Sequence, residues 1–270
     1  MYEEVNIDPN SGASMHGAAV ASIAVGKNVG VAPDARLFFI GTSTFDSEDM
    51  GNCKYPNGGE IPSRHFKYYA RAINRLLEIN KLLPSDQKIK VLSMSIGWSD
   101  SQCDKETDLF KEAIENAKQN GIFVIFSSIE KVYGSKFKFH GLGRLPLANS
   151  MGFSSYEPGL FWEDKFYEEI SSGSYLYDRL LIPMDSRTVA SQGGDDEYVF
   201  YREGGWSWSI PYIAGMYALA LQVNQNITPE EFWAQALKTG ETIKLWHDGN
   251  KVKLGPILNS VKLIEAISNN

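Results

Sequence analysis

Two polar side chains open apolar helical stretches near opposite ends of the chain. His16 begins a stretch rich in alanine, and Ser207 follows Gly204 and Gly205 at the start of a second apolar stretch. Free N–H groups and the helix dipole stabilise developing negative charge at a helix start, which suits Ser207 as a nucleophile. A histidine is a common base for such a hydroxyl. The simpler alternatives are a capping or surface role for His16 and an N-cap role for Ser207, with Pro211 in the first turn.

A third segment offers its backbone. The strand predicted at residues 90–96 runs into Ser95-Ile96-Gly97, and such an edge can pair with an extended peptide by β-augmentation. Ser95, Ile96 and Gly97 are therefore candidate substrate-binding residues. An ordinary core strand that ends at a glycine is the alternative, and both interpretations stay open on this segment alone.

The elements that must position these residues alternate between helix and strand. Apolar spacing predicts helices at residues 16–25, 65–83, 109–118, 209–223, 229–237 and 258–267. It predicts strands at residues 36–40, 90–96, 122–126, 180–182 and 197–201, with loops and short strands over 131–174. This order favours crossover connections and an α/β fold with a mostly parallel sheet covered by helices on both faces. Without repeats or a Pro/Ser linker, we expect residues 1–270 to form a single domain.

Composition excludes several classes of protein. The chain has 270 residues, with 26 Lys+Arg against 33 Asp+Glu, so its net charge of −7 argues against a nucleic-acid partner. Hydrophobic residues make up 43%, enough for a sizeable core. No apolar run approaches the roughly 18 residues that span a membrane. The acidic start Met1-Tyr2-Glu3-Glu4 lacks the apolar core of a signal peptide, and the compartment stays open.

The two cysteines allow at most one disulfide. Cys53 and Cys103 are the only cysteines among 270 residues, which excludes a disulfide framework. We expect them to be isolated thiols. His65, His140 and His247 show no metal-ligand spacing with one another or with the cysteines, so no metal site is expected there.

Together, the three segments resemble the subtilisin-like serine proteases, or subtilases. The serine motif of that family reads Gly-Thr-Ser-Met-Ala-Ser-Pro-His-Val-Ala-Gly, and the positions that match in register are Gly205, Ser207, Pro211, Ala214 and Gly215. The family's histidine motif, His-Gly-Thr-His-Val-Ala-Gly, is similar to residues 16–22. Gly30-Val31-Ala32-Pro33-Asp34-Ala35 is nearly identical to the turn that follows it in the family.

Two further motifs extend the resemblance over residues 14–237. Residues 93–98 resemble the family's substrate-edge strand, Asn-Met-Ser-Leu-Gly-Gly, and Leu181-Ile182-Pro183 lies where the family has an Ala-Pro-Gly turn. Four motifs in order imply the subtilisin-like fold. They also imply that Ser207 attacks the scissile carbonyl, that His16 takes its proton, and that the Ser207 N–H is one oxyanion donor.

The third member of the family's triad, an aspartate, has no clear counterpart. It ends the first strand of the family domain, some tens of residues before the histidine, whereas only 15 residues precede His16. Asp8 is the one acid in a suitable place. The chain from Asp8 to His16 spans 8 residues, and in an extended form, at about 3.3 Å per residue, it reaches back to the histidine. Asp8 is otherwise a turn residue before Pro9. The alternative hypothesis places the aspartate on a segment absent from this chain, such as a separate N-terminal segment or propeptide.

The oxyanion side chain is also displaced. The family has Ala-Ala-Gly-Asn after a strand like residues 122–126, and here Glu130 aligns with that asparagine. A carboxylate there would repel the oxyanion unless it were protonated or turned away. Ser127 or Ser128 is the candidate replacement donor, and Asn149 lies too far along the chain.

These departures leave two functions open. In subtilases, loss of the asparagine costs about 10²–10³ in turnover and loss of the aspartate roughly 10⁴. The leading function is a serine endopeptidase that cleaves extended peptides, with weak activity if both groups are absent. The alternative is a catalytically inactive homologue that binds a peptide or protein partner. Trp206 and Trp208 replace Thr and Met beside Ser207, where they either narrow the cleft or serve packing.

No cofactor is expected. Many subtilases carry calcium, so the acidic loops at residues 104–106 and 194–197 are considered as loose Ca²⁺ sites. Solvated loops are the simpler interpretation of both clusters.

Overall fold

A computed structural model describes residues 15–42, 53–54, 60–61, 63–98, 103–149, 152–172 and 178–269. Its helices are α1 (Met15–Val25), α2 (Lys67–Leu82), α3 (Thr107–Gln119), α4 (Glu130–Tyr133), α5 (Glu163–Ser171), α6 (Trp206–Val223), α7 (Pro229–Thr239) and α8 (Ser260–Ser268). Short 3₁₀ turns cover Ser85–Gln87, Phe153–Ser155 and Leu160–Trp162. No helix among these described residues is long and apolar enough to cross a membrane.

Two sheets carry the architecture. In the first, β4 (Val91–Met94) pairs in parallel with β6 (Phe123–Phe126). The second has the order β12-β13-β9-β7-β8 and contains β7 (Lys138–Arg144), β8 (Tyr156–Pro158), β9 (Arg179–Pro183), β12 (Glu241–His247) and β13 (Asn250–Ile257). Its inner pairs β13–β9 and β9–β7 are parallel, and the outer pairs are antiparallel.

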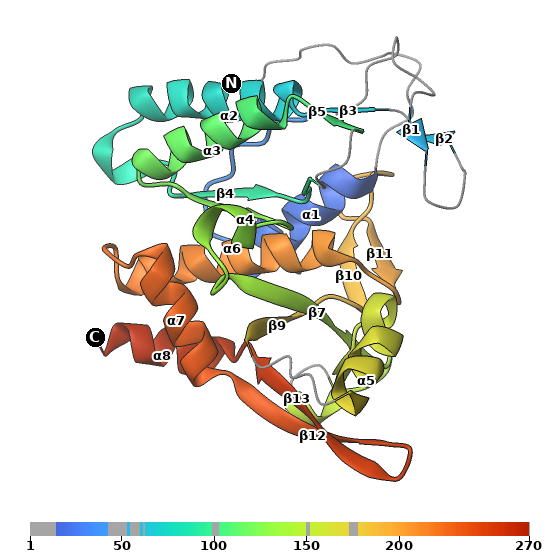
Figure 1. Cartoon of the computed structure of the whole chain (residues 1–270). Helices are drawn as coiled ribbons and strands as arrows, with labels where there is room; N and C mark the ends of the chain where they lie inside the picture. The colour runs from blue at the N-terminus through green and yellow to red at the C-terminus, as the bar shows by residue number, and fades with distance from the viewer. Residues whose placement is uncertain are drawn as a thin grey trace.

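Three smaller pairings complete the described strands. They are β1 (Cys53–Lys54) with β2 (Glu60–Ile61), β3 (Arg64–His65) with β5 (Asp104–Lys105), and β10 (Arg187–Ala190) with β11 (Tyr198–Tyr201). The β3–β5 pair is parallel. Helices α2 and α3 lie on one side of β4 and β6, with α6 on the other (Figure 1). The predicted α/β class, with parallel strands at its centre and helices on both faces, is confirmed.

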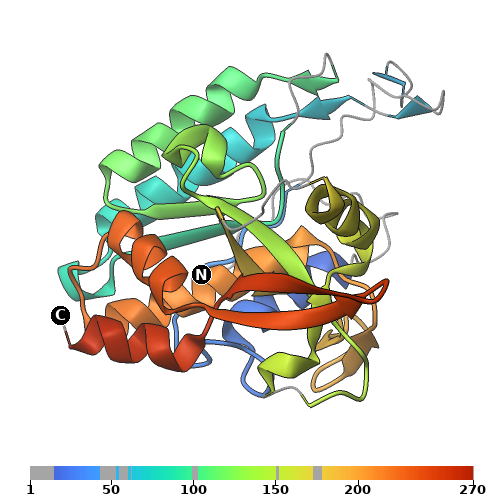
Figure 2. The same ribbon diagram turned by 60° about the horizontal axis from the view of Figure 1, so that its bottom comes forward.

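The core forms where apolar faces meet. One cluster joins α2, α3, β6 and the helices α6 to α8, and its fully buried side chains include Phe66, Phe110, Phe123 and Trp233. Helix α6 is apolar almost all round, as expected of a helix covered on several sides. The β12–β13 hairpin, red in Figure 2, runs from the end of α7 toward the opposite end of the molecule.

Three sequence expectations are corrected by the structure. Residues 36–40, predicted as a strand, belong to no sheet among the described residues, and Leu37 and Phe39 are 49% and 58% exposed. The segment 131–174, expected to hold only loops and short strands, contains the helix α5 and the seven-residue strand β7. The β12–β13 hairpin was not predicted.

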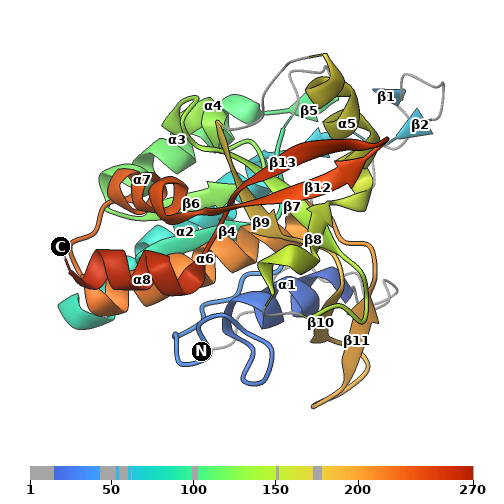
Figure 3. The same ribbon diagram turned by 90° about the horizontal axis from the view of Figure 1, so that it is seen from below.

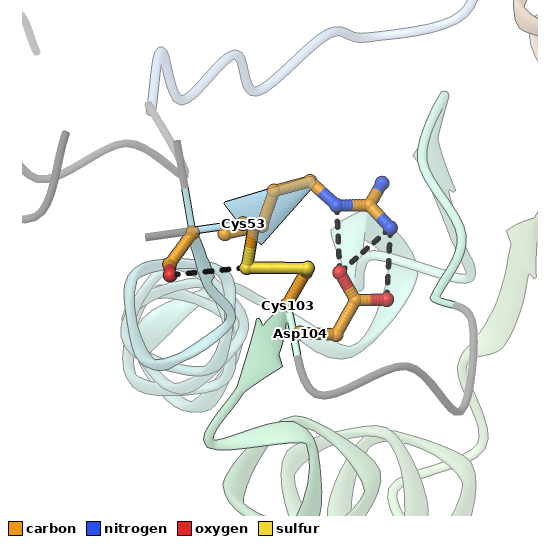
Figure 4. The surroundings of a disulfide bond; sticks show 5 residues. Cys53, Cys103 and Asp104 are labelled. Atoms are coloured by element: carbon orange, nitrogen blue, oxygen red, sulfur yellow. Dashed lines mark hydrogen bonds and ion pairs between the residues drawn. A yellow bond between two sulfur atoms is a disulfide. The ribbon is translucent and has the colours of Figure 1, made fainter. Parts of the chain in front are cut away.

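The cysteines are joined, so the expectation of isolated thiols was wrong. Cys53 and Cys103 form a disulfide with a Cα–Cα distance of 5.6 Å (Figure 4). Parallel pairing of Arg64 with Asp104 brings the neighbourhoods of the two cysteines together. The sequence separation of 50 residues conceals this proximity.

Candidate active site

Helices α1 and α6 bring the two predicted catalytic residues into one region. His16 lies in the first turn of α1 and Ser207 in the first turn of α6, and the two helices pack together (Figure 3). The His16 ring stacks on Trp208, the residue after Ser207, with ring centroids 5.9 Å apart and planes 22° apart. Burial by this packing lowers the pKa of His16 below 6.5. The imidazole is therefore neutral at pH 7, the form that accepts a proton.

Small residues allow this close approach. A Cβ added to Gly215 of α6 would lie 2.6 Å from Cβ of Val31 and 3.1 Å from the carbonyl oxygen of Ala24. Any larger side chain at Gly215 would push α6 away from the segment that ends α1. The buried cluster between the helices, which includes Ala19, Ile23 and Trp208, holds the first turns in place.

Ser207 is not the N-cap of its helix. Gly205 occupies that position with no side-chain cap, which leaves the Ser207 hydroxyl free of the capping role considered from the sequence. Pro211 lies four residues later, and it has no N–H to donate to the Ser207 carbonyl. Ser95 replaces that donor, because its Oγ lies 2.9 Å from the Ser207 carbonyl oxygen. The predicted substrate-edge segment and the start of α6 are thereby joined directly.

The middle residue of the substrate-edge segment, Ile96, is hydrogen-bonded to the rest of the protein through its backbone. Ile96 is engaged within the protein: its N–H donates to the Met94 carbonyl at 2.7 Å, and its carbonyl accepts from the Ser127 N–H at 2.9 Å. The first of these bonds closes a three-residue turn centred on Ser95, and the second joins the segment to the end of β6. Pairing of Ser95, Ile96 and Gly97 with an extended peptide stays a prediction.

These features agree with comparisons to known proteins. The family model of the subtilases matches residues 2–134. Over this part, the sequence of the chain is similar to that of the subtilases. No curated protein compared with the chain matches it.

Solved structures show that the fold of this chain is subtilisin-like. A structure of the assembly of subtilase cytotoxin SubAB aligns with a TM-score of 0.54 at 17% identity, covering 94% of this chain and 77% of that chain. The A-subunit of the AB5 toxin from E. coli aligns with a TM-score of 0.52 at 16% identity over 94% and 79% of the two chains. The self-cleaved protease domain of PatA aligns with a TM-score of 0.53 at 16% identity over 94% and 83%.

Two of the candidate oxyanion residues, Ser127 and Ser128, lie beside the substrate-edge segment. The Ser128 hydroxyl donates to the Trp98 carbonyl at 3.2 Å. Glu130 lies in the first turn of α4, where its carbonyl oxygen accepts from the Gly134 N–H. Ser127 keeps its hydroxyl beside Gly97. Asp8, the candidate triad acid, lies outside the described residues.

Asp185 is a candidate positioning residue that the sequence analysis does not include. Its buried carboxylate accepts from the Gly204 N–H at 2.7 Å and from the Leu160 N–H at 2.9 Å, which fixes the glycine pair that precedes Ser207. Burial raises the pKa of Asp185. The available signal was its place just after the apolar strand 180–182, because acids at such strand ends often serve a site.

The carboxylates of the acidic loop at residues 104–106 have partners within the protein. Asp104 accepts two hydrogen bonds from Arg64, and Glu106 contacts His65 and Lys67. Calcium binding at residues 104–106 and 194–197 remains an expectation from the family resemblance.

Proposed function

We propose that this chain is a subtilisin-like serine endopeptidase that cleaves extended peptides or proteins. The observation that carries the proposal is the stacking of His16 on Trp208, which places the imidazole beside the first turn that holds Ser207. His16 takes the proton from Ser207 Oγ as that oxygen attacks the scissile carbonyl carbon. The same proton passes to the leaving amine as the C–N bond breaks. A water molecule then hydrolyses the acyl ester by the same route.

The start of α6 supports the developing oxyanion. The first N–H groups of a helix have no intrahelical acceptor, and Ser207 lies in this first turn. Without the family's asparagine, stabilisation of the oxyanion depends more on this backbone N–H donor. We therefore expect slower acyl transfer than in a subtilase with the full motif, by about 10²–10³.

For the acid that orients His16, we propose either Asp8 or a strand contributed by a separate N-terminal segment or propeptide. Among the described residues, β4 pairs only with β6, and residues 36–40 belong to no sheet. An open edge can accept a further parallel strand. The Asp8→Asn variant separates the two: it loses about 10⁴ in turnover if Asp8 is the acid and is unchanged if a separate segment supplies it.

A catalytically inactive, peptide-binding homologue is the second candidate. The specific observation that favours it is the Ser128 hydroxyl, which is committed to the Trp98 carbonyl. Together with the indoles of Trp206 and Trp208, this arrangement reduces both oxyanion stabilisation and access. In this case the edge at Ser95 and Gly97 would still bind an extended chain.

Hydrolysis of a fluorogenic mixture of peptides tests the proposal. The wild-type chain should release product, and the Ser207→Ala and His16→Ala variants should lose this release while keeping the far-ultraviolet circular dichroism spectrum of the wild type. Binding of the mixture without turnover by a folded wild-type chain would instead support the inactive homologue. Turnover that persists in Ser207→Ala would reject Ser207 as the nucleophile.

A further inference from the structure

Arg64 is hydrogen-bonded to residues at the Cys53–Cys103 disulfide. Its Nε donates to Asp104 Oδ1 at 2.7 Å, and its Nη2 donates to Asp104 Oδ2 at 2.8 Å. The side chain of Asp104 is 1% exposed. Cys103 precedes Asp104 and is bonded to Cys53 (Figure 4). The Cys103 carbonyl accepts from the Arg64 N–H at 2.9 Å.

The third arm of the guanidinium reaches the substrate-edge segment. Arg64 Nη1 donates to the Gly97 carbonyl oxygen at 3.3 Å. A planar guanidinium can bind one carboxylate with two donors and still present a donor on its remaining nitrogen, which an ammonium group cannot do in the same geometry. The contact thus connects the Cys53–Cys103 disulfide to the segment 95–97.

The other end of this segment is already fixed. Trp98 is buried, stacks on Phe126 with ring centroids 5.3 Å apart, and meets Phe110 edge-on at 5.6 Å. At the opposite end, Ser95 is held by the hydrogen bond from its hydroxyl to the Ser207 carbonyl oxygen. Between these anchors, Gly97 has a wide choice of backbone torsions, so the hydrogen bond from Arg64 can set the direction of its carbonyl.

We infer that Arg64 is a positioning residue that orients the Gly97 carbonyl for pairing with an extended substrate. This inference rests on the proposed function, because it concerns the peptide edge of the same site. An oriented carbonyl keeps one lone pair for Arg64 and offers the other to a peptide N–H. Without Arg64, binding of a peptide would also have to order residues 95–97, and this ordering costs free energy. Affinity for extended peptides should therefore fall, while chemistry at Ser207 changes little.

The test uses peptide affinity in a background that cannot cleave. A fluorescein-labelled mixture of decapeptides is titrated into Ser207→Ala and into Ser207→Ala with Arg64→Ala, and fluorescence anisotropy is measured. We expect binding to weaken about tenfold, the usual effect of losing one hydrogen bond to a charged group. Arg64→Lys should resemble Arg64→Ala, because lysine lacks the third arm. Arg75→Ala, which removes a surface ion pair with Glu78 on α2, is the matched control and should bind as the parent does.

The outcomes separate this inference from the proposed function. Equal affinity of the Arg64→Ala and parent proteins, or no binding by either, overturns the positioning role. In the cleaving background, Arg64→Ala should raise KM about tenfold and move kcat far less; a fall in kcat alone also overturns it. If the wild-type chain never cleaves, the proposed function fails, and the affinity comparison still decides the role of Arg64. Arg64→Gln is used if Arg64→Ala does not fold.

Discussion

His140 is a partly buried imidazole whose protonation state is coupled to folding. Its ring stacks on Trp162 with centroids 4.3 Å apart, and burial, aided by the positive charges of Arg179 and Lys165, lowers the pKa of His140 to about 4. An unfolded histidine titrates near 6.5. Between these values the unfolded chain binds a proton that the folded chain does not, so this contribution to stability is complete above pH 6.5 and is lost as the pH falls toward 4.

The His140→Phe variant should therefore lose less stability in acid than the wild type. Between pH 7 and pH 4.5, the free energy of unfolding of the wild type should fall by about 2–3 kcal/mol more than that of the variant. Urea denaturation at the two pH values measures this difference. Equal losses in both proteins would show that His140 does not contribute to acid sensitivity.

The indole beside His16 should tune the pH range of the reaction. Since burial lowers the pKa of His16, reaction of Ser207 should persist to a lower pH than with an exposed imidazole. The Trp208→Met variant, which restores the family's residue, should expose the ring and move the acidic limb of the rate profile upward toward pH 6.5. An acidic limb that stays in place in Trp208→Met would show that Trp208 does not desolvate His16.

At the scale of an element, Pro211 and Ser95 form a dependent pair. The helix α6 loses one internal hydrogen bond at Pro211, and the Ser95 hydroxyl supplies the Ser207 carbonyl with a substitute donor. Ser95→Ala alone should cost about 1 kcal/mol of unfolding free energy, because the carbonyl is left without a partner.

The same change should cost less once the helix can supply its own donor. Pro211→Ala restores an N–H, so Ser95→Ala in that background should be closer to neutral. Thermal or urea unfolding of the two single variants and the double variant measures the coupling. Additive losses would mean that the Ser95 bond is independent of the proline.

Elements with strong periodicity could be predicted from the sequence, and elements that depend on a distant partner could not. Helices α2 and α3 lie within a few residues of the predicted 65–83 and 109–118, because their apolar faces repeat along the chain. Residues 36–40 have the composition of a strand, but a strand needs a neighbour to bond with. The sequence analysis did not predict the β12–β13 hairpin. In β12, partly buried and exposed residues alternate, and the inward Ile243 and Leu245 only flank a core cluster, so the apolar pattern of this strand is weak.

At the scale of the whole molecule, one covalent link joins distant parts of the sequence. The Cys53–Cys103 disulfide closes a loop across 50 residues that contains α2, β4 and the substrate-edge segment. Cross-linking over this length reduces the entropy of the unfolded chain and is worth about 4 kcal/mol in the loop-closure account. The double variant Cys53→Ser with Cys103→Ser should unfold at a lower urea concentration, because its free energy of unfolding should be smaller than that of the wild type by about 4 kcal/mol. A midpoint that stays the same in the variant and in the reduced wild type would contradict this role.

The candidate site was predictable in part. Motif order along the chain located His16 and Ser207, whose neighbourhoods the fold brings together through Trp208. The contacts of Arg64 and Asp185 with backbone groups far along the chain carry no local pattern, so only the structure reveals them. The commitment of the Ser128 hydroxyl to Trp98 was hidden for the same reason.

Labelling by a fluorophosphonate tests most directly whether His16 activates Ser207. The reagent phosphonylates an activated serine hydroxyl and needs no extended substrate, so peptide mass mapping of the treated protein reports on this pair alone. We predict one adduct on Ser207 of the folded wild type, none in Ser207→Ala, and labelling slowed by orders of magnitude in His16→Ala. An adduct at another residue, full-rate labelling without His16, or a folded wild type that does not react would contradict the account.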